Sequence, residues 1–492
     1  MENNILLKTD SYKISHHRQY PPETTTVYAY LESRGGDYPE QVFFGLQYIL
    51  KKHLVGKIVT KEYIDEAVQF WNKHFGYDIV DREMWEYIVE KHDGHLPIRI
   101  KAVPEGTVVP TGNVLMTIEN TDPKCPSLTT FLETILLQVW YPITIATNSR
   151  EIKKILLRSL VKTGDPTMVK SKLHDFGFRG VSSYETSAIG SCAHLTSFTG
   201  TDTISGCVLA HNYYLADDMV AFSIPASEHS TMVSWTREKE REAYENMLDA
   251  YPTGIIACVS DSYNIYDACE HIWGELLHDK VIARDGTVVI RSDSGDPLEV
   301  LERLLIILYD KFGGHENEKG YKVLDKHVRL IQGDGVNMKS IEAIVDLLER
   351  IGFSTDNLMF GSGGKSTLSI KVLPFTFRFP GGLLQKFDRD TMKFAIKCSY
   401  VEINGIGGLA VAKNPITDKG KRNKPGRLKL VKDTNGQYRT LSSIDQSNEY
   451  DNAEDLLVTV YENGQLLCDY SFNTIRANCD IDPDHLDFMH IM

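Results

Sequence analysis

The sequence predicts an α/β protein with a (β/α) barrel-like domain and a discontinuous α+β domain that is built from both chain ends. Two observations carry this prediction. From about residue 170 to residue 364, short apolar or β-rich runs end in polar or glycine-rich tips, and most are followed by a plausible helix. The flanking segments instead mix helical periodicity with short alternating strands. Strands that alternate with helices imply a parallel sheet, whereas mixed segments are typical of an α+β unit.

The first 160 or so residues contain both kinds of element. Residues 26–31 are β-rich and predict a strand, and residues 41–92 carry apolar side chains near helical spacing. Residues 96–120 alternate and turn at PEG and PTGN, which predicts a β-meander, and residues 127–161 predict helices interrupted at Pro142. The segment before residue 26 is dense in Tyr, His and Arg, so its composition alone predicts a solvated arm.

The central region repeats a strand-plus-tip unit about seven times over nearly 200 residues. Seven units suggest closure into a barrel, and barrel enzymes keep their chemistry on the loops that follow the strands. A doubly wound open sheet is the alternative. The tips carry Asp175 and Arg179, Asp202, His229 after Ser223, Ser260 and Asp261, Arg291 and Asp293, Gly333 and Asp334, and finally Gly363 and Gly364.

The C-terminal region returns to short strands. Residues 393–412 predict β structure, a basic loop follows, and residues from about 430 onward alternate turns with short strands. We expect this region to rejoin the N-terminal unit. The predicted ranges are therefore 1–165 for the first part of the α+β domain, 166–390 for the barrel-like catalytic domain and 391–492 for the returning part.

Composition excludes several classes of function. The chain has 492 residues, of which 53 are Lys or Arg and 67 are Asp or Glu, so its formal net charge is −14. This charge argues against broad nucleic-acid binding, which needs a basic surface. The eight cysteines show no CxxC spacing, which disfavours zinc and a disulfide framework. The first residues do not resemble a signal peptide, and no apolar run approaches the roughly 20 residues that span a bilayer. We expect a cytoplasmic protein without membrane association.

The polar tips together describe a site for a phosphorylated, diphosphorylated sugar. Arginine forks suit phosphate oxygens, and glycine-rich tips expose backbone N–H groups that favour phosphate. Aspartates among those arginines could bind ribose hydroxyls or help to hold Mg²⁺ through water. His229 follows small residues that leave room around its imidazole, as a nucleophilic or proton-transferring histidine requires. A structural hydrogen-bonding role for His229 is the alternative.

The order of motifs resembles that of a known family. DSYKISHHRQYPP, LHDFGFRGVSS, GTDT, SIPASEHST, SDSYNIY, RSDSGDP, IQGDGV, GLLQKFDRD and KCSY occur as they do in the nicotinamide phosphoribosyltransferases. The resemblance runs from about residue 8 to at least residue 430. It implies a barrel paired with an α+β domain, a homodimer with shared active sites, and transfer of the 5-phosphoribosyl group from phosphoribosyl diphosphate to nicotinamide. It also implies Mg²⁺ and ATP as a co-substrate.

The resemblance assigns a role to each matching residue. His229 matches the histidine that ATP phosphorylates, and Asp293 lies near the ribose. Phe176 and, from the other subunit, Tyr12 would stack on the pyridine, which replaces the solvated-arm interpretation. Asp202 would accept a hydrogen bond from the carboxamide. The further matching positions, expected to bind substrate, are Asp10, Arg34, Arg179, Ser223, Ser260, Arg291, Gly333, Asp334, Gly363, Gly364, Arg389, Lys397, Lys413 and Lys421.

The chain departs from the family pattern in one place. Residues 365–381 stand between GSGG and GLLQK, which run almost directly together in the family. Their alternating apolar residues predict a hairpin with an apolar face. The insert leaves open whether Gly363–Gly364 or Gly381–Gly382 supplies the phosphate-binding N–H groups. Two alternative functions stay open. One is a nicotinate phosphoribosyltransferase, which Asp202 disfavours, and the other is a binding homologue that the insert has made catalytically silent.

Overall fold

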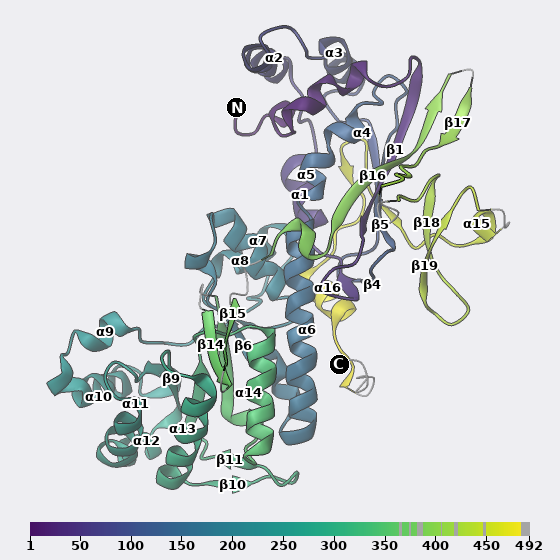
Figure 1. Ribbon diagram of the computed structural model, residues 1–492. Helices are drawn as coiled ribbons and strands as arrows, with labels where there is room; N and C mark the ends of the chain where they lie inside the picture. The colour runs from purple at the N-terminus through teal and green to yellow at the C-terminus, as the bar shows by residue number, and fades with distance from the viewer. Residues whose placement is uncertain are drawn as a thin grey trace. The chain divides into compact units, whose positions relative to one another are not determined.

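The described residues of the computed structural model form two compact units (Figure 1). The structure describes residues 1–363, 367–372, 375–380, 387–404, 406–417, 422–445 and 449–483. The first unit comprises residues 1–147, 212–216 and 387–479, and the second comprises residues 148–211, 217–386 and 480–492. The division falls inside helix α6, Trp140–Thr163, whereas the predicted range 1–165 placed the whole of that helix in the first unit.

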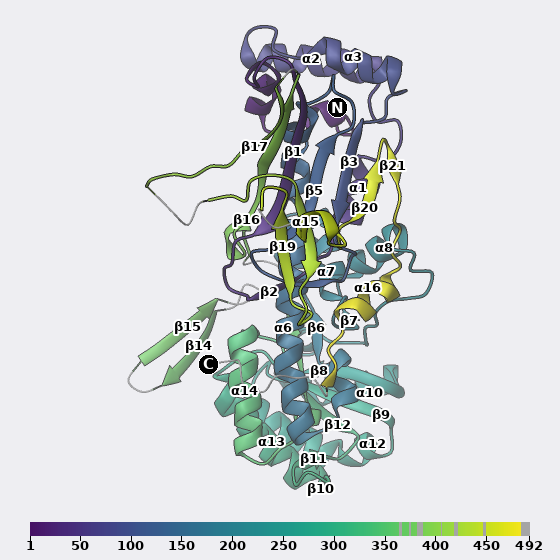
Figure 2. The same ribbon diagram turned by 90° about the vertical axis from the view of Figure 1, so that its right-hand side faces the viewer.

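A seven-stranded antiparallel sheet forms the core of the first unit. Its order is β17-β16-β1-β5-β3-β20-β21, so C-terminal strands flank three central N-terminal strands on both sides, with β17 and β21 at opposite edges (Figure 2). The strands are β1 Thr24–Ser33, β3 Ile98–Ala102, β5 Val114–Asn120, β16 Phe394–Ile403, β17 Gly407–Ala410, β20 Val458–Glu462 and β21 Gln465–Leu466. The prediction that the C-terminal region rejoins the N-terminal unit is confirmed.

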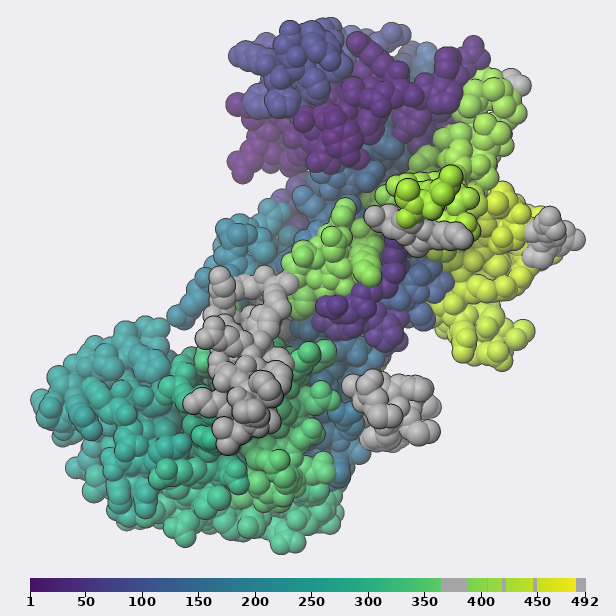
Figure 3. Space-filling model, in the orientation of Figure 1, coloured from purple at the N-terminus to yellow at the C-terminus, as the bar shows by residue number. Residues whose placement is uncertain are grey.

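Smaller elements surround this sheet. Two-stranded sheets pair β2, Glu40–Val42, with β4, Val108–Pro110, and β18, Leu428–Lys432, with β19, Tyr438–Ser442. The helices are α1 Leu46–His53, α2 Lys61–Phe75, α3 Arg82–Lys91, α4 Leu128–Phe131, α5 Glu133–Leu137, α15 Glu449–Asn452 and α16 Phe472–Cys479. In Figure 3 the purple N-terminal residues and the green and yellow C-terminal residues share the surface of this unit.

Two local expectations in this unit are wrong. Residues 11–18 form a 3₁₀ helix, η2, that buries Lys13 and Ile14, so this segment packs and is not a solvated arm. Lys13 Nζ lies 3.0 Å from Glu133 Oε2, which compensates its charge. Pro142 does not interrupt a helix, because it lies in the first turn of α6, where the backbone N–H has no helical partner.

The second unit is built around parallel strands. The six-stranded sheet has the order β7-β6-β13-β12-β9-β8, with β6 Leu173–Asp175, β7 Gly200–Thr201, β8 Thr253–Val259, β9 Asp285–Ser292, β12 Val328–Gln332 and β13 Leu358–Ser362. Both edge strands also bond to the segment at residues 222–227. Phe222 bridges to Gly200 on one side, and Ala226 bridges to Ala257 on the other. This segment therefore joins the two edges, and the seven predicted units follow one another around a ring.

One layer of side chains fills the interior of this ring. Ala257, Val289 and Ile331 are buried there, and the partly buried Phe176, Ile224 and Met359 pack against them. Each comes from a different strand or strand tip, as expected when inward-facing residues of a barrel stack in layers. The barrel-like fold class is confirmed.

Helices follow most of these strands. They are α7 Tyr184–His194, α8 Ile204–Tyr213, α9 His229–Val233, α10 Glu240–Ala250, α11 Ile265–Asp267, the π-helix η6 Ala268–Leu276, α12 His278–Ile282, α13 Pro297–Phe312 and α14 Met338–Arg350. The strands β10, Gly314–Glu316, and β11, Lys322–Leu324, form a small separate pair. Among the described residues, no helix has the length and apolar character needed to cross a membrane.

The insert forms the predicted hairpin. Strand β14, Thr367–Val372, pairs antiparallel with β15, Phe375–Pro380. The predicted apolar face concerns side chains that lie outside the described part of the structure.

Candidate active site

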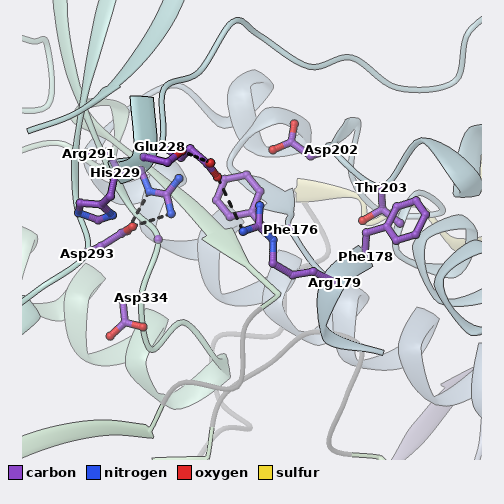
Figure 4. A pocket seen from close by; sticks show the side chains of 12 residues that line it. Phe176, Phe178, Arg179, Asp202, Thr203, Glu228, His229, Arg291, Asp293 and Asp334 are labelled. Carbon is purple, nitrogen blue, oxygen red and sulfur yellow. Dashed lines mark hydrogen bonds and ion pairs between the residues drawn. The ribbon is translucent and has the colours of Figure 1, made fainter. Parts of the chain in front are cut away.

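A pocket of about 560 Å³ opens beyond the carboxyl ends of the barrel strands (Figure 4). This is the end at which barrel enzymes carry their functional loops. Eight residues of the predicted site converge on it: Phe176, Arg179, Asp202, His229, Arg291, Asp293, Gly333 and Asp334. The other lining residues are Phe178, Thr203, Glu228 and Ser230.

Phe176 presents a flat apolar surface in this pocket. Its ring occupies the space over Gly361 of β13, because a methyl group at Gly361 would lie only 1.9 Å from Phe176 Cε2. The guanidinium carbon of Arg291 lies 5.4 Å from the ring centroid, within the range of a cation–π contact. A planar aromatic ligand can therefore stack on Phe176 beside a fixed positive charge.

Arg291 and Asp293 form a two-point ion pair at the end of β9. Arg291 Nε donates to Asp293 Oδ1 at 2.8 Å, and Nη2 donates to Oδ2 at 2.6 Å. Gly333 on the neighbouring strand tip leaves room for the pair, since a methyl group there would lie 2.8 Å from Asp293 Oδ1. The fork geometry holds the guanidinium in one orientation and leaves its other N–H groups for an anion.

Asp202 contributes a negative charge to the same pocket. Its Oδ1 atom accepts hydrogen bonds from Ser223 Oγ at 2.5 Å and from His174 Nε2 at 3.0 Å. Burial alone would raise the pKa of this carboxyl, but the hydrogen bonds from His174 and Ser223 and the positive charge of Arg291 outweigh it and lower the pKa. Asp202 is therefore ionised at neutral pH and can only accept hydrogen bonds.

His229 is the first residue of α9 and is held by a buried carboxylate. Its Nε2 atom lies 2.9 Å from Oδ1 of Asp261, whose side chain is only 2% exposed whereas that of His229 is 46% exposed. The other Asp261 oxygen accepts from the Asp293 backbone N–H and from Ser294 Oγ. One carboxylate thus fixes both the imidazole and the loop that carries Asp293. Since a carboxylate only accepts, Nε2 carries the hydrogen and Nδ1 keeps its lone pair.

The residues beside His229 shape the outer part of the pocket. Glu228 is the N-cap of α9 and forms a capping box: its side chain accepts the Thr231 backbone N–H, and Thr231 Oγ1 accepts the Glu228 backbone N–H. Arg179 Nη1 lies 4.0 Å from Glu228 Oε2, and its side chain is 86% exposed. This guanidinium is therefore available to an anion that enters the pocket.

The remaining predicted residues of this unit are not all in the pocket. Ser223 acts through Asp202, as described above. Ser260 is buried, accepts a hydrogen bond from Trp273 Nε1 and donates to the Cys258 carbonyl, so it supports β8. Gly363 gives Phe176 room, since a methyl group there would lie 2.1 Å from the Phe176 carbonyl carbon. Gly364, Gly381 and Gly382 lie outside the described residues.

Seven predicted residues belong to the first unit, and all of them except Lys421 lie in its described part. Asp10 accepts from Thr134 Oγ1 at 2.7 Å, and the Tyr12 side chain is exposed. The other four described residues are cations that lie within electrostatic reach of one another. Burial lowers the pKa of Lys397, and the positive charges of its neighbours lower it further against the opposing effect of Glu133. These neighbours are Arg34, Arg389 and Lys413. Such a cluster of cations suits an anionic ligand.

The sequence interpretation missed two residues that organise the site. Asp261 was noted as a strand tip but not as the partner of His229, and only the fold reveals that it bonds to two loops. His174 was not noted at all, because a histidine inside a strand resembles a core residue. Its position two residues before Phe176, on the inward face of β6, is the signal that could have revealed it.

Comparison with solved structures shows the class of fold. The chain is similar to nicotinate-nucleotide pyrophosphorylase from Pyrococcus furiosus, with a TM-score of 0.59 and 15% identity over 97% of this chain and 95% of that one. It is also similar to human nicotinic acid phosphoribosyltransferase, with a TM-score of 0.50 and 15% identity over 96% and 93% of the two chains. The fold is thus that of the type II phosphoribosyltransferases.

Sequence comparison then gives the family. The model of the nicotinate phosphoribosyltransferase (NAPRTase) family matches residues 171–465, and that of the nicotinamide phosphoribosyltransferase N-terminal domain matches residues 4–100. A nicotinamide phosphoribosyltransferase of Xanthomonas campestris is 48% identical over 97% of this chain and 98% of its own length. That of Acinetobacter baylyi is 32% identical over 96% of both. The chain belongs to the nicotinamide phosphoribosyltransferases within the NAPRTase family.

Proposed function

We propose that this protein transfers the 5-phosphoribosyl group from phosphoribosyl diphosphate to nicotinamide, giving nicotinamide mononucleotide and pyrophosphate. The observation that carries the proposal is one pocket that combines an aromatic face, an ionised carboxylate and two arginines. Phe176, Asp202, Arg179 and Arg291 supply these groups. They match the pyridine ring, the carboxamide and the diphosphate of the two substrates.

Recognition of the base rests on Phe176 and Asp202. The pyridine ring stacks on the phenyl face, which contributes about 0.5–1.5 kcal/mol beyond the area that the contact buries. The ionised Asp202 carboxylate accepts a hydrogen bond from the carboxamide NH₂ and repels a carboxylate at the same position. The pocket therefore favours nicotinamide over nicotinate by combining an attraction with a repulsion.

Recognition of the sugar diphosphate rests on the arginines. Arg291 is oriented by Asp293, and Arg179 is exposed at the pocket rim. Departure of pyrophosphate from the anomeric carbon builds positive charge on the ribose ring and negative charge on the leaving group. Guanidinium groups that are already in place stabilise that leaving group without reorganising at the moment of reaction. Gly333 and Asp334 lie on the rim where the ribose 5-phosphate would bind.

The carboxylates of the pocket are compatible with a Mg²⁺ ion that is bound mainly by the phosphates of the substrate. Among the described residues, no three His, Cys, Asp or Glu side chains converge to hold a metal ion. Mg²⁺ usually keeps several waters and binds through one or two carboxylates plus substrate phosphates, so it needs no such group. Asp293 and Asp334 would be its protein contacts, and the ion would neutralise charge on the leaving pyrophosphate.

We further propose that ATP phosphorylates His229. The hydrogen bond to Asp261 leaves Nδ1 with the lone pair, so Nδ1 is the atom that attacks the γ-phosphorus while ADP departs. Exposure of the ring at the start of a helix gives the incoming phosphate access. The phosphorylated imidazole would then place negative charge beside Arg291 and Asp293, where it helps to order the sugar diphosphate and its Mg²⁺.

A homodimer with shared active sites is part of the proposal. Tyr12 is exposed and could cover the second face of the pyridine in a neighbouring copy, with Asp10 beside it. The cation cluster around Lys397 would bind phosphates contributed to that site. The cytoplasmic location stays a prediction.

The direct test is product analysis. The purified chain is incubated with nicotinamide, phosphoribosyl diphosphate, ATP and Mg²⁺, and the products are separated and identified by mass. We expect nicotinamide mononucleotide and pyrophosphate in equal amounts. Substrate binding without any product would instead support the silent binding homologue.

A further inference from the structure

His174 is one of two side chains that hydrogen-bond to the Asp202 carboxylate, the other being Ser223. It lies on β6 and directs Nε2 to Asp202 Oδ1 at 3.0 Å. The His174 side chain is 14% exposed, whereas that of Asp202 is 46% exposed. The imidazole is thus largely covered and faces the interior, while the carboxylate that it contacts faces the pocket.

Neighbouring glycines give the imidazole its place. Strand pairing puts Gly200 of β7 and Gly361 of β13 on either side of His174. A methyl group at Gly200 would lie 2.6 Å from His174 Nδ1, and one at Gly361 would collide with Phe176. The rings of His174 and Phe176 are tilted neighbours with centroids 5.2 Å apart. Packing against β7 and Phe176 therefore restricts the rotation of the imidazole.

The two hydrogen-bond donors to the Asp202 carboxylate bond to the same oxygen. His174 Nε2 and Ser223 Oγ bond to Oδ1. A carboxylate oxygen has two lone-pair sites, so these two bonds occupy Oδ1 and set the rotation of the carboxylate. Oδ2 is then the oxygen left for a ligand that carries N–H groups.

We propose that His174 is a positioning residue that sets the preference of this enzyme for a carboxamide over a carboxylate. It does so by holding Asp202 through Oδ1, so that Oδ2 faces the NH₂ of the bound base. The inference rests on the proposed function and deepens it. Because His174 acts through Asp202, it does not touch the substrate. Its loss should therefore alter selection of the base and leave the phosphoribosyl diphosphate site unchanged.

The test compares two substitutions at one position. His174→Leu removes the donor and keeps an apolar side chain of moderate size, whereas His174→Gln keeps an N–H donor near the position of Nε2. His271→Leu, on an exposed histidine of η6, is the matched control. For each variant kcat/KM is measured with nicotinamide and with nicotinate, and the inhibition constant of pyridine is measured as well. Pyridine stacks on Phe176 but offers nothing to Asp202.

We expect the ratio of kcat/KM for amide over acid to fall about tenfold in His174→Leu, the loss typical of one hydrogen bond to a charged group. His174→Gln should keep most of the ratio, and the pyridine inhibition constant should stay within about twofold. The inference is overturned by an unchanged ratio in His174→Leu, by an equal loss in both variants, or by a parallel weakening of pyridine. A wild-type enzyme that makes no nicotinamide mononucleotide would instead refute the proposed function itself.

Discussion

His229 and Asp261 are joined by a hydrogen bond of 2.9 Å between Nε2 and Oδ1, and the same carboxylate holds the backbone N–H of Asp293. One buried side chain, that of Asp261, therefore fixes both the proposed phosphate acceptor, His229, and the loop that carries Asp293, the partner of Arg291. If ATP phosphorylates His229 as proposed, this side chain would connect that step to phosphoribosyl transfer within one unit of the chain. The connection gives the first two predictions.

Replacing His229 by alanine should abolish ATP hydrolysis and leave the pyridine pocket formed. The physical reason is that the variant lacks the only ring nitrogen that Asp261 orients, while Phe176 and Asp202 keep their contacts. ATPase activity and nicotinamide binding are measured side by side, with His271→Ala as the control. Retained ATPase activity in His229→Ala would move the phosphorylation site elsewhere.

Replacing Asp261 by asparagine should lower ATP hydrolysis at least tenfold without abolishing it. An amide can still meet the imidazole, but it no longer stabilises positive charge on the ring, and a charge-assisted hydrogen bond is about twice as strong as a neutral one. Acid-labile phosphate on the protein provides the readout. A rate equal to that of wild type would show that Asp261 only supports the fold.

Replacing Gly361 by alanine should raise KM for nicotinamide by at least tenfold. The new methyl group would lie 1.9 Å from Phe176 Cε2, so the ring must leave its stacking position. Gly274→Ala is the matched control, because its methyl group would also be crowded, at 2.7 Å from the Cys269 carbonyl oxygen, yet it lies in η6. Both variants should lose thermal stability, and only Gly361→Ala should change KM.

Glu105 should make the stability of the first unit depend on pH. Burial raises its pKa from 4.5 to about 7, although its carboxylate accepts N–H bonds from Gly45 and Gln47. A carboxyl whose folded-state pKa exceeds its unfolded value binds a proton more tightly when folded. Stability therefore falls as pH rises from about 4.5 through 7, by up to about 3 kcal/mol.

The check compares thermal unfolding at pH 5 and pH 8. Wild type should lose stability on this change, and Glu105→Gln should lose less because its side chain does not titrate. Glu318→Gln, on an exposed loop residue, controls for a general effect of removing one carboxyl. An equal pH response in wild type and Glu105→Gln would contradict the prediction.

Deleting residues 365–381 should change the rate of nucleotide formation by less than tenfold. The hairpin of β14 and β15 is paired within itself, so its removal takes no strand from the barrel sheet. A variant in which a Gly/Ser linker of equal length replaces the segment separates the effect of length from that of sequence. Activity that emerges only after deletion would favour the silent homologue for the full chain.

The positions of the strand ends could be predicted from the sequence more fully than the backbone bonds that close the ring of strands. Apolar runs that stop at Asp202, Arg291 or Asp334 are visible as local patterns, so the seven units and the side of the barrel that carries the site could be predicted. The contacts by which residues 222–227 close the ring could not, because this segment is irregular and meets β7 and β8 through isolated backbone bridges and through Ser227 Oγ, which accepts the Val259 N–H. No local pattern distinguishes such a segment from a loop.

The direction in which each side chain points was the second feature that the sequence could not predict. Ser260 lies at the end of a strand like the other predicted residues, but its hydroxyl is buried and accepts a hydrogen bond from the indole N–H of Trp273. His174 and Asp261 gain their roles from residues that lie about 30 positions away, Asp202 and His229. Such partners become visible only when parallel strands place their ends together.

Competition between nicotinamide and nicotinate tests most directly the central claim that Asp202 makes this protein a nicotinamide phosphoribosyltransferase. The enzyme is given equal concentrations of nicotinamide and nicotinate with limiting phosphoribosyl diphosphate, ATP and Mg²⁺, and the two mononucleotides are quantified by mass. The ionised Asp202 carboxylate predicts that nearly all product is nicotinamide mononucleotide. A product that is mainly nicotinate mononucleotide would contradict the proposed role of Asp202 and the proposed function with it.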